Sequence, residues 1–303
     1  MKAAGSARAL AALLRLPYWL MTGGLALLTA FAILKGNFSN VQTTFGPVSL
    51  GLVAFLTFFS MAFIASAGFA INDYFDRESD AVIKPKRPIP SGALSLKQVI
   101  VVTSVLFALG LVLSALINWL SFAIIAADSL MLLVYSYLVK RKSGFAANLL
   151  MGILTGTAFI YGQATVSGTV TLVSLSLYPI AFGTIGGNVL RDILSMDGDS
   201  KVGYPTLPQK IGAVSAAKVG AIFFLLTGLL APLPALPLFL GHFTVYYLPL
   251  ILLWSVLLIY SAIRLFVSSS TIANIRKYER LVTMSMMLLP LALIVEAVLG
   301  WLL

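Results

Sequence analysis

Residues 48–71 read VSLGLVAFLTFFSMAFIASAGFAI and are followed at once by NDYFDRESD at residues 72–80. The first segment carries no charge and exceeds the roughly 20 residues that a helix needs to cross a ~30 Å hydrocarbon core. The second segment holds four of the ten acidic residues of the chain. This junction predicts a transmembrane helix that ends in a polar, acidic site at one face of the membrane.

The composition of the 303 residues supports the same fold class. Hydrophobic residues make up 60%, charged residues only 10%, and the mean hydropathy is +1.01. Soluble domains carry about 25% charged residues, so a soluble enzyme, a secreted disulfide scaffold and a disordered chain are excluded. The chain has no cysteine and one histidine, which excludes thiol catalysis, iron–sulfur ligation and a multi-histidine metal site.

Apolar runs bounded by charge or by Gly and Pro predict about nine transmembrane helices. They lie near 16–35, 48–71, 99–117, 119–139, 145–167, 170–190, 213–231, 243–267 and 281–303. Asn118 alone separates the third and fourth spans, which predicts a tight helical hairpin. Ser91 or Ser95, the latter with Gln98 three residues on, is expected to cap the third span. The predicted fold is all-α, a single transmembrane domain over 1–303 with its helices around a central cavity that opens to the cytoplasmic side.

The basic residues predict the orientation. All of the 20 Lys and Arg residues except Lys35 fall on the same side of the nine spans. The positive-inside rule places that side, with the N-terminus, in the cytoplasm of an integral protein of the cell membrane. The net charge of +10 therefore sets topology and meets anionic lipid headgroups, and we expect neither a nucleic acid nor a protein partner.

The first acidic cluster has helical spacing. Asn72, Asp76 and Asp80 are four residues apart and share one face if the helix continues. Bare carboxylates there repel each other and oppose the helix dipole, so a compensating cation is expected. Carboxylate and amide oxygens suit Mg²⁺, which shares its ligand shell with substrate phosphates.

A second acidic cluster follows the sixth span. Asp192 and Asp199 are seven residues apart on one helical face, with Ser195 between them. The two clusters end spans that point the same way, which allows a parallel internal repeat with acidic motifs at 72–80 and 192–199. Facing each other, they could hold Mg²⁺ ions around a diphosphate. Neighbouring Lys and Arg residues would stabilise the diphosphate as it leaves, and aromatic faces would stabilise a carbocation.

These motifs resemble the UbiA superfamily of intramembrane prenyltransferases over about residues 15–210. Asn72 to Asp80 is similar to the family's NxxxDxxxD signature, and RPIPSG at 87–92 is similar to its RPLPSG run. Weaker similarities are Arg15-Leu16-Pro17, Tyr135-Ser136 followed by Lys140 with Asn148 beyond, and Arg191 to Asp199 followed by Thr206-Leu207-Pro208. One departure is Ser195, which stands where the second motif usually has an Asp.

The resemblance implies Mg²⁺-dependent transfer of an isoprenyl group from a polyprenyl diphosphate to a lipophilic acceptor, through an allylic cation. The implied metal-linked residues are Asn72, Asp76, Asp80, Asp192 and Asp199. The implied catalytic residues are Asp76, Asp80, Lys140 and Arg191. The implied substrate-binding residues are Asn72, Arg87, Tyr135, Lys140, Arg15 and Asn148. The acceptor is left open between an aromatic acid, a quinone precursor, a haem or chlorophyll precursor and a prenylated glycerol phosphate.

Two other functions, a secondary transporter and a CDP-alcohol phosphotransferase, are consistent with parts of the sequence. A secondary transporter also places charges near helix ends, but its site should lie near the midplane, where Asp128 alone is predicted. Asp128 could pair, stay protonated or touch the acceptor. A CDP-alcohol phosphotransferase should contain a DGxxAR run, which the sequence lacks. His242 and Glu296 are expected to lie away from the chemistry.

Overall fold

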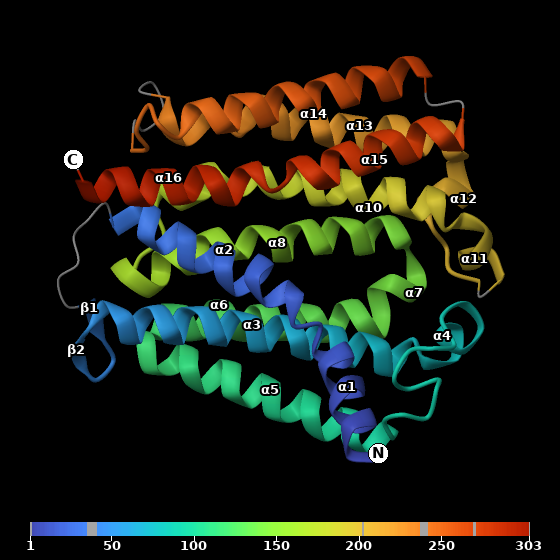
Figure 1. Ribbon diagram of the computed structural model, residues 1–303, viewed down its shortest axis with the longest axis horizontal. Coiled ribbons are helices and arrows are strands. Elements are labelled where there is room, and N and C mark those ends of the chain that lie inside the picture. Colours follow the sequence, from blue (N-terminus) through green and yellow to red (C-terminus); the bar gives the residue numbers. More distant parts are fainter. Residues whose placement is uncertain (1, 35–40, 202, 237–241, 269–270, 303) are drawn as a thin grey trace.

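The long helices of the computed structural model lie side by side along its longest axis (Figure 1). The structure describes residues 2–34, 41–201, 203–236, 242–268 and 271–302. Within these ranges, nine helical segments are long and apolar enough to cross a membrane: 17–34, 50–75, 96–117, 119–142, 144–167, 172–194, 213–235, 248–268 and 272–299. The predicted all-α, polytopic fold is confirmed. Lys35, the one basic residue expected on the opposite side, lies outside the described residues.

The first half of the chain builds one side of the bundle (Figure 1). Its elements are α1 (Lys2–Leu14), α2 (Pro17–Leu34), β1 (Val41–Thr43), β2 (Gly46–Val48), α3 (Leu50–Phe75), α4 (Arg77–Ile83), α5 (Leu96–Ile117), α6 (Trp119–Val134), the π-helical turn η1 (Tyr135–Val139), α7 (Lys140–Lys142) and α8 (Gly144–Ser167). Helix α3 packs on α5 and α2, and α2 packs on α8.

The second half contains the remaining helices. They are α9 (Leu172–Leu177), the 3₁₀ turn η2 (Tyr178–Ala181), α10 (Phe182–Leu194), α11 (Met196–Lys201), α12 (Leu207–Ile211), α13 (Ala213–Leu230), the 3₁₀ turn η3 (Leu233–Ala235), α14 (Leu248–Ser268), α15 (Ile272–Ser285) and α16 (Leu288–Leu302). Helix α13 packs on α10 and α14. The ninth span begins at Ile272, earlier than the expected 281, because the polar start of α15 is helical too.

Local capping sets several helix ends as the sequence predicts. Ser95 and Gln98 form a capping box at the start of α5, which satisfies backbone N–H groups that lack intrahelical partners. Asn118 ends α5 and caps α6, since its side chain accepts a hydrogen bond from the Ser121 N–H at 2.8 Å. The third and fourth spans therefore form the expected hairpin.

The two ends of the bundle differ in chemistry. The short helices α4, α7, α11 and α12 gather at one end, on the right in Figure 1. We call this end the motif end, because it carries the two acidic motifs and the RPIPSG run. The β1–β2 hairpin, which was not predicted, and the C-terminus lie at the other end. Antiparallel pairing of Val41 with Val48 sets the register of the hairpin.

Candidate active site

Asp76 is the centre of the site. It lies where α3 ends and α4 begins, and only 6% of it is exposed. The backbone N–H of Asp80 still donates to the Asp76 carbonyl at 2.8 Å, so the helical path continues through a bend. The Asn72 amide donates to Asp76 Oδ2 at 2.9 Å, and the Lys140 ammonium pairs with the same oxygen. Asn72, Asp76 and Lys140 are therefore brought together as the sequence predicts.

Two arginines link the rest of the first motif. Arg15 Nη2 lies 2.8 Å from Asp73 Oδ1, and Arg87 Nη1 lies 2.9 Å from the same oxygen. Arg87 Nη1 also reaches Asp80 Oδ2 at 2.5 Å. Asp73 and Asp80 are 4% and 5% exposed, so the ion pairs are shielded from water and screened little by salt. Asp73 is a site residue that the spacing argument missed, because it is out of phase with Asn72, Asp76 and Asp80.

Arg15 has an unusual backbone. Its φ of 49° lies in the left-handed region, which costs a residue with a Cβ roughly 1–2 kcal/mol. The turn joins α1 to α2, whose first residue is Pro17, a position that suits proline. The Arg15 guanidinium also stacks over Phe69, 4.4 Å from the ring centroid. The strained turn thus aims Arg15 at Asp73, and strain of this kind is frequent at functional sites.

Lys140 follows a π-helical turn. The Lys140 N–H donates to the Tyr135 carbonyl, five residues back, where an α-helix would use a spacing of four. The extra residue rotates the chain that follows, and π turns inside helices often lie at functional sites. Tyr135 lies within electrostatic range of both Asp76 and Asp192.

The second motif is held by neighbours of its own. The Asn148 amide donates to Asp192 Oδ2 at 2.7 Å, and the Ser195 hydroxyl donates to Asp199 Oδ2 at 2.6 Å. The family motif usually has an Asp at position 195. In this chain Ser195 stands there and orients the carboxylate of Asp199. Arg191 points elsewhere: its Nε lies 3.2 Å from Glu279 Oε1 on α15, and half of its side chain is exposed.

Tyr204 joins the two motifs. It lies between α11 and α12, where its backbone N–H donates to the Asp199 carbonyl at 3.1 Å and its hydroxyl donates to Asp76 Oδ1 at 2.6 Å. Ser79 lies 2.9 Å from the same hydroxyl. Desolvation, and then the hydrogen bond to Asp76, raise the pKa of Tyr204, so the phenol stays a proton donor at neutral pH. Lys140 interacts electrostatically with Asp192 as well. No sequence pattern predicts the Tyr204 contact, which joins residues 128 positions apart.

The donor set suits a hard cation. Asn72 Oδ1 is buried and has no hydrogen-bond partner among the described residues, although such oxygens are almost always paired. The same side chain contacts the carboxylate of Asp76, and oxygen-only ligands fit Mg²⁺. In the described residues, no three acids stand together as a ready-made metal cage. The carboxylates are neutralised instead by Lys140, Arg87 and Arg15.

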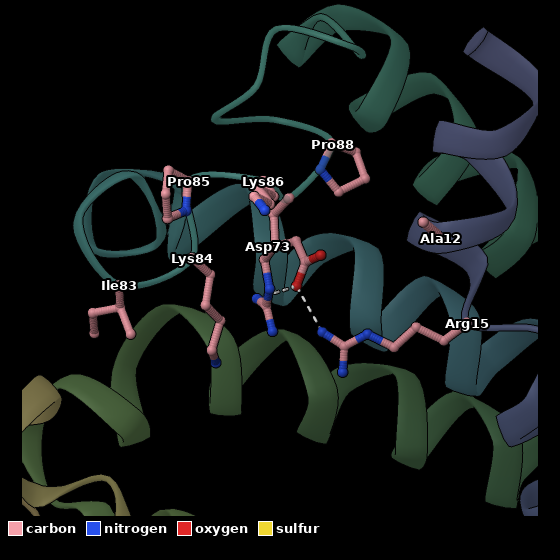
Figure 2. Close-up of a pocket in the computed structure, with 9 residues that line it drawn as sticks. Ala12, Arg15, Asp73, Ile83, Lys84, Pro85, Lys86 and Pro88 are labelled. Atoms are coloured by element: carbon pink, nitrogen blue, oxygen red, sulfur yellow. Dashed lines mark hydrogen bonds and ion pairs between the residues drawn. The ribbon is translucent and has the colours of Figure 1, made fainter.

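A cavity of about 500 Å³ opens beside Asp73 (Figure 2). Its lining residues are Ala12, Arg15, Asp73, Ile83, Lys84, Pro85, Lys86, Arg87 and Pro88. Partial desolvation, and then repulsion from Arg87, lower the pKa of Lys84. Asp80 attracts Lys84, and Lys140 and Arg15 repel it more weakly. This corner of the site therefore concentrates positive charge.

Three other polar residues, Asp128, Glu296 and His242, lie apart from these contacts. Asp128 is buried between α6 and α8, where Oδ2 accepts a hydrogen bond from the Thr157 hydroxyl at 2.8 Å. Glu296 accepts hydrogen bonds from the Thr244 N–H and hydroxyl, at 2.9 and 2.7 Å. His242 neighbours Phe243, with ring centroids 5.8 Å apart.

Comparison with known proteins decides the family. The sequence matches the UbiA prenyltransferase family over residues 26–289. The chain belongs to the UbiA prenyltransferase family. It is 36% identical, over 76% of its length and 78% of the relative's, to a protein of Natronomonas pharaonis named digeranylgeranylglyceryl phosphate synthase. The secondary-transporter alternative finds no support, and the protein is a membrane-embedded prenyltransferase.

Solved structures of UbiA proteins share the fold. One, described as digeranylgeranylglyceryl phosphate synthase in membranes, has a TM-score of 0.75 and 28% identity, covering 97% of this chain and 99% of that one. Another, a UbiA homologue of Archaeoglobus fulgidus bound to GPP and Mg²⁺, has a TM-score of 0.62 and 20% identity, covering 94% and 99%. At 20% identity the second structure supports the fold alone.

Proposed function

We propose that this prenyltransferase moves a geranylgeranyl group from geranylgeranyl diphosphate to the free hydroxyl of geranylgeranylglyceryl phosphate. The observation that carries the proposal is the 36% identity to a relative named for the product, digeranylgeranylglyceryl phosphate. Of the acceptors left open by the sequence, a prenylated glycerol phosphate is the one that this match favours. The cation-rich cavity beside the first motif suits an acceptor that carries a phosphate.

Mg²⁺ is the proposed cofactor. Its donors would be Asn72, Asp76, Asp80, Asp192 and Asp199, and the unpaired Asn72 oxygen favours this assignment. When bound, the ion neutralises diphosphate oxygens and so weakens the bond that must break. The A. fulgidus homologue bound to GPP and Mg²⁺ gives a precedent for the pairing of an isoprenyl diphosphate with this ion in the family.

The cationic side chains would bind the leaving diphosphate. Lys140 and Arg87 already contact Asp76 and Asp80, so they can exchange a carboxylate for a diphosphate oxygen with little movement. Arg191 stays a proposed contributor, although it pairs with Glu279 in this structure. Tyr135, Asn148 and Arg15 are proposed to complete the substrate-binding surface.

Bond making follows bond breaking in this proposal. The allylic C–O bond breaks with its electron pair on diphosphate, and Lys140 and Arg87 stabilise that charge. The hydroxyl oxygen of the acceptor attacks the allylic carbon, and its proton passes to diphosphate or to a motif carboxylate. The low exposure of Asp73, Asp76 and Asp80 supports a water-poor site, which would limit capture of the cation by water.

We further propose that the motif end and the N-terminus face the cytoplasm. The basic residues at that end support this orientation by the positive-inside rule. The isoprenyl chains would lie between helices with access from the lipid. We also propose that residues 1–303 form a single domain and that it contains a parallel internal repeat with one acidic motif in each half.

The test is a product assay in nanodiscs with radiolabelled geranylgeranyl diphosphate and Mg²⁺. Parallel reactions receive geranylgeranylglyceryl phosphate, 4-hydroxybenzoate or a naphthoate. The proposal expects a labelled product with geranylgeranylglyceryl phosphate only. Efficient labelling of an aromatic acceptor, with none of the glycerol phosphate, would overturn it.

A further inference from the structure

The cavity beside Asp73 is lined by four cationic side chains and one carboxylate. Arg15 comes from the α1–α2 turn, and Lys84, Lys86 and Arg87 come from the loop after α4. In Figure 2, Lys84 and Arg15 reach in from opposite sides, with Asp73 between them. We call this space the basic cavity.

The charges in the basic cavity do not balance. Arg15 and Arg87 are both paired with Asp73, and Arg87 is also paired with Asp80. Lys84 and Lys86 have no ion-pair partner in the part of the chain that the structure describes. Lys84 and Lys86 line the same cavity as this neutralised arginine pair, so an anion there would meet positive charge that no carboxylate balances.

The basic cavity shares Asp73 with the first acidic motif, while Asp76, Asp80 and Lys140 are not among its lining residues. One nitrogen, Arg87 Nη1, contacts both Asp73 in the cavity and Asp80 in the motif. Arg87 thus forms a shared wall. An anion beside Lys84 and Lys86 would lie next to a diphosphate held by Lys140 and by Mg²⁺ on Asp76 and Asp80, without occupying the same place.

The chemistry of the acceptor requires such a neighbouring anion site. In a prenylated glycerol phosphate, the attacking hydroxyl and the phosphate lie on adjacent carbons of glycerol. When the hydroxyl reaches the allylic carbon, the acceptor phosphate must lie close to the departing diphosphate. Two such anions repel strongly where water is scarce, so each needs its own cations.

We infer that Lys84 and Lys86, together with Arg15, bind the phosphate monoester of the acceptor and thereby select a phosphorylated acceptor. This inference rests on the proposed function. The apolar part of the lining, Ala12, Ile83, Pro85 and Pro88, offers the glycerol carbons a surface that does not compete for the phosphate. An aromatic acceptor without phosphate would leave the two lysines unused.

The test compares Lys84→Gln, Lys86→Gln and the double variant with a matched control, Lys97→Gln, in nanodiscs of zwitterionic lipid. Lys97 is the second residue of α5, at the same end, and lies outside the basic cavity. The measurements are the KM for geranylgeranylglyceryl phosphate, the KM for geranylgeranyl diphosphate, and turnover of geranylgeranylglycerol, which lacks the phosphate. Thermal unfolding checks that the variants are folded.

Each single variant should raise the acceptor KM roughly tenfold, since a charge-assisted contact is lost, and the double variant should raise it further. The donor KM should not change, and Lys97→Gln should match the wild type. The wild-type preference for the phosphorylated acceptor over geranylgeranylglycerol should shrink in the double variant by the same factor as the KM rises.

Three results would overturn the inference. The donor KM could rise in place of the acceptor KM, which would assign the lysines to the diphosphate. The preference for the phosphorylated acceptor could survive in the double variant. Wild-type turnover could depend on added anionic lipid through Lys84 and Lys86, which would assign the cavity to a lipid headgroup. If the wild type cannot convert the phosphorylated acceptor at all, the proposed function itself fails.

Discussion

At the scale of single residues, Asp76 has partners on both of its oxygens. Oδ2 faces Asn72 and Lys140, and Oδ1 accepts the Tyr204 hydroxyl. A carboxylate with several donors is held in one orientation, and that orientation is what a metal or a diphosphate would meet. We therefore expect Tyr204 to act on the chemistry through Asp76, as a positioning residue.

Tyr204→Phe removes the hydrogen bond and keeps the ring. A hydrogen bond to a charged group contributes about 1.5–3 kcal/mol, so kcat should fall about ten- to hundredfold. The KM for the acceptor should change little, because Tyr204 is absent from the basic cavity. Steady-state kinetics measure both values. The control is Tyr246→Phe, at an exposed tyrosine. If both variants have the same kcat, Tyr204 does not position Asp76 for catalysis.

At the scale of elements, the close contact of α10 with α13 depends on glycine. A Cβ at Gly186 would lie 2.7 Å from the Gly220 carbonyl oxygen and 2.7 Å from the buried Phe224 ring. Small residues allow membrane helices to approach closely and pack well. Because α10 ends close to Asp192, this contact also fixes the position of the second motif.

Gly186→Ala should therefore destabilise the protein by about 1–3 kcal/mol through overpacking. Gly24→Ala is the matched control, because a Cβ there meets no other atom within 4 Å; its stability should be unchanged or raised, since alanine favours helix. Unfolding in mixed micelles with increasing denaturant compares the two variants. Equal stability of both would show that the α10–α13 contact adapts freely.

Elements were predictable to different degrees. The nine spans follow from composition, since each is a long apolar run, and the Ser95 and Asn118 caps follow from local side-chain chemistry. The π turn at Tyr135 and the β1–β2 hairpin were not predicted. A π turn differs from an α turn by one hydrogen-bond register, which no residue pattern in Tyr135–Val139 marks. The hairpin strands have three residues each, too few for a periodic signal.

Some residues of the candidate site could be predicted from the sequence and others could not. Asn72, Asp76 and Asp80 were predictable because they repeat at helical spacing, and Lys140, Arg87 and Asn148 because they match family motifs. The roles of Asp73 and Tyr204 depend on contacts between distant segments, Arg15 with Asp73 and Tyr204 with Asp76. Such pairs become visible only when the helices are packed.

At the scale of the whole molecule, the basic residues predict one orientation in the membrane. Because the chain has no cysteine, single cysteines can report it without background. Lys142→Cys lies at the motif end and Thr169→Cys follows α8 at the opposite end; both positions are exposed. In intact cells, a membrane-impermeant maleimide should label the Thr169→Cys variant. The Lys142→Cys variant should be labelled only after the cells are permeabilised. The reverse pattern would place the site on the outer face.

Prenyl transfer at Asp76 is tested by the single-turnover rate of digeranylgeranylglyceryl phosphate formation in nanodiscs, with and without Mg²⁺, for the wild type and Asp76→Asn. We predict product from the wild type with Mg²⁺ only. Asp76→Asn should lose about a thousandfold or more in rate, because a charge at the reacting centre is removed, and thermal unfolding checks that the variant is folded. Near-normal turnover by Asp76→Asn, or by the wild type without a divalent cation, would contradict this prediction.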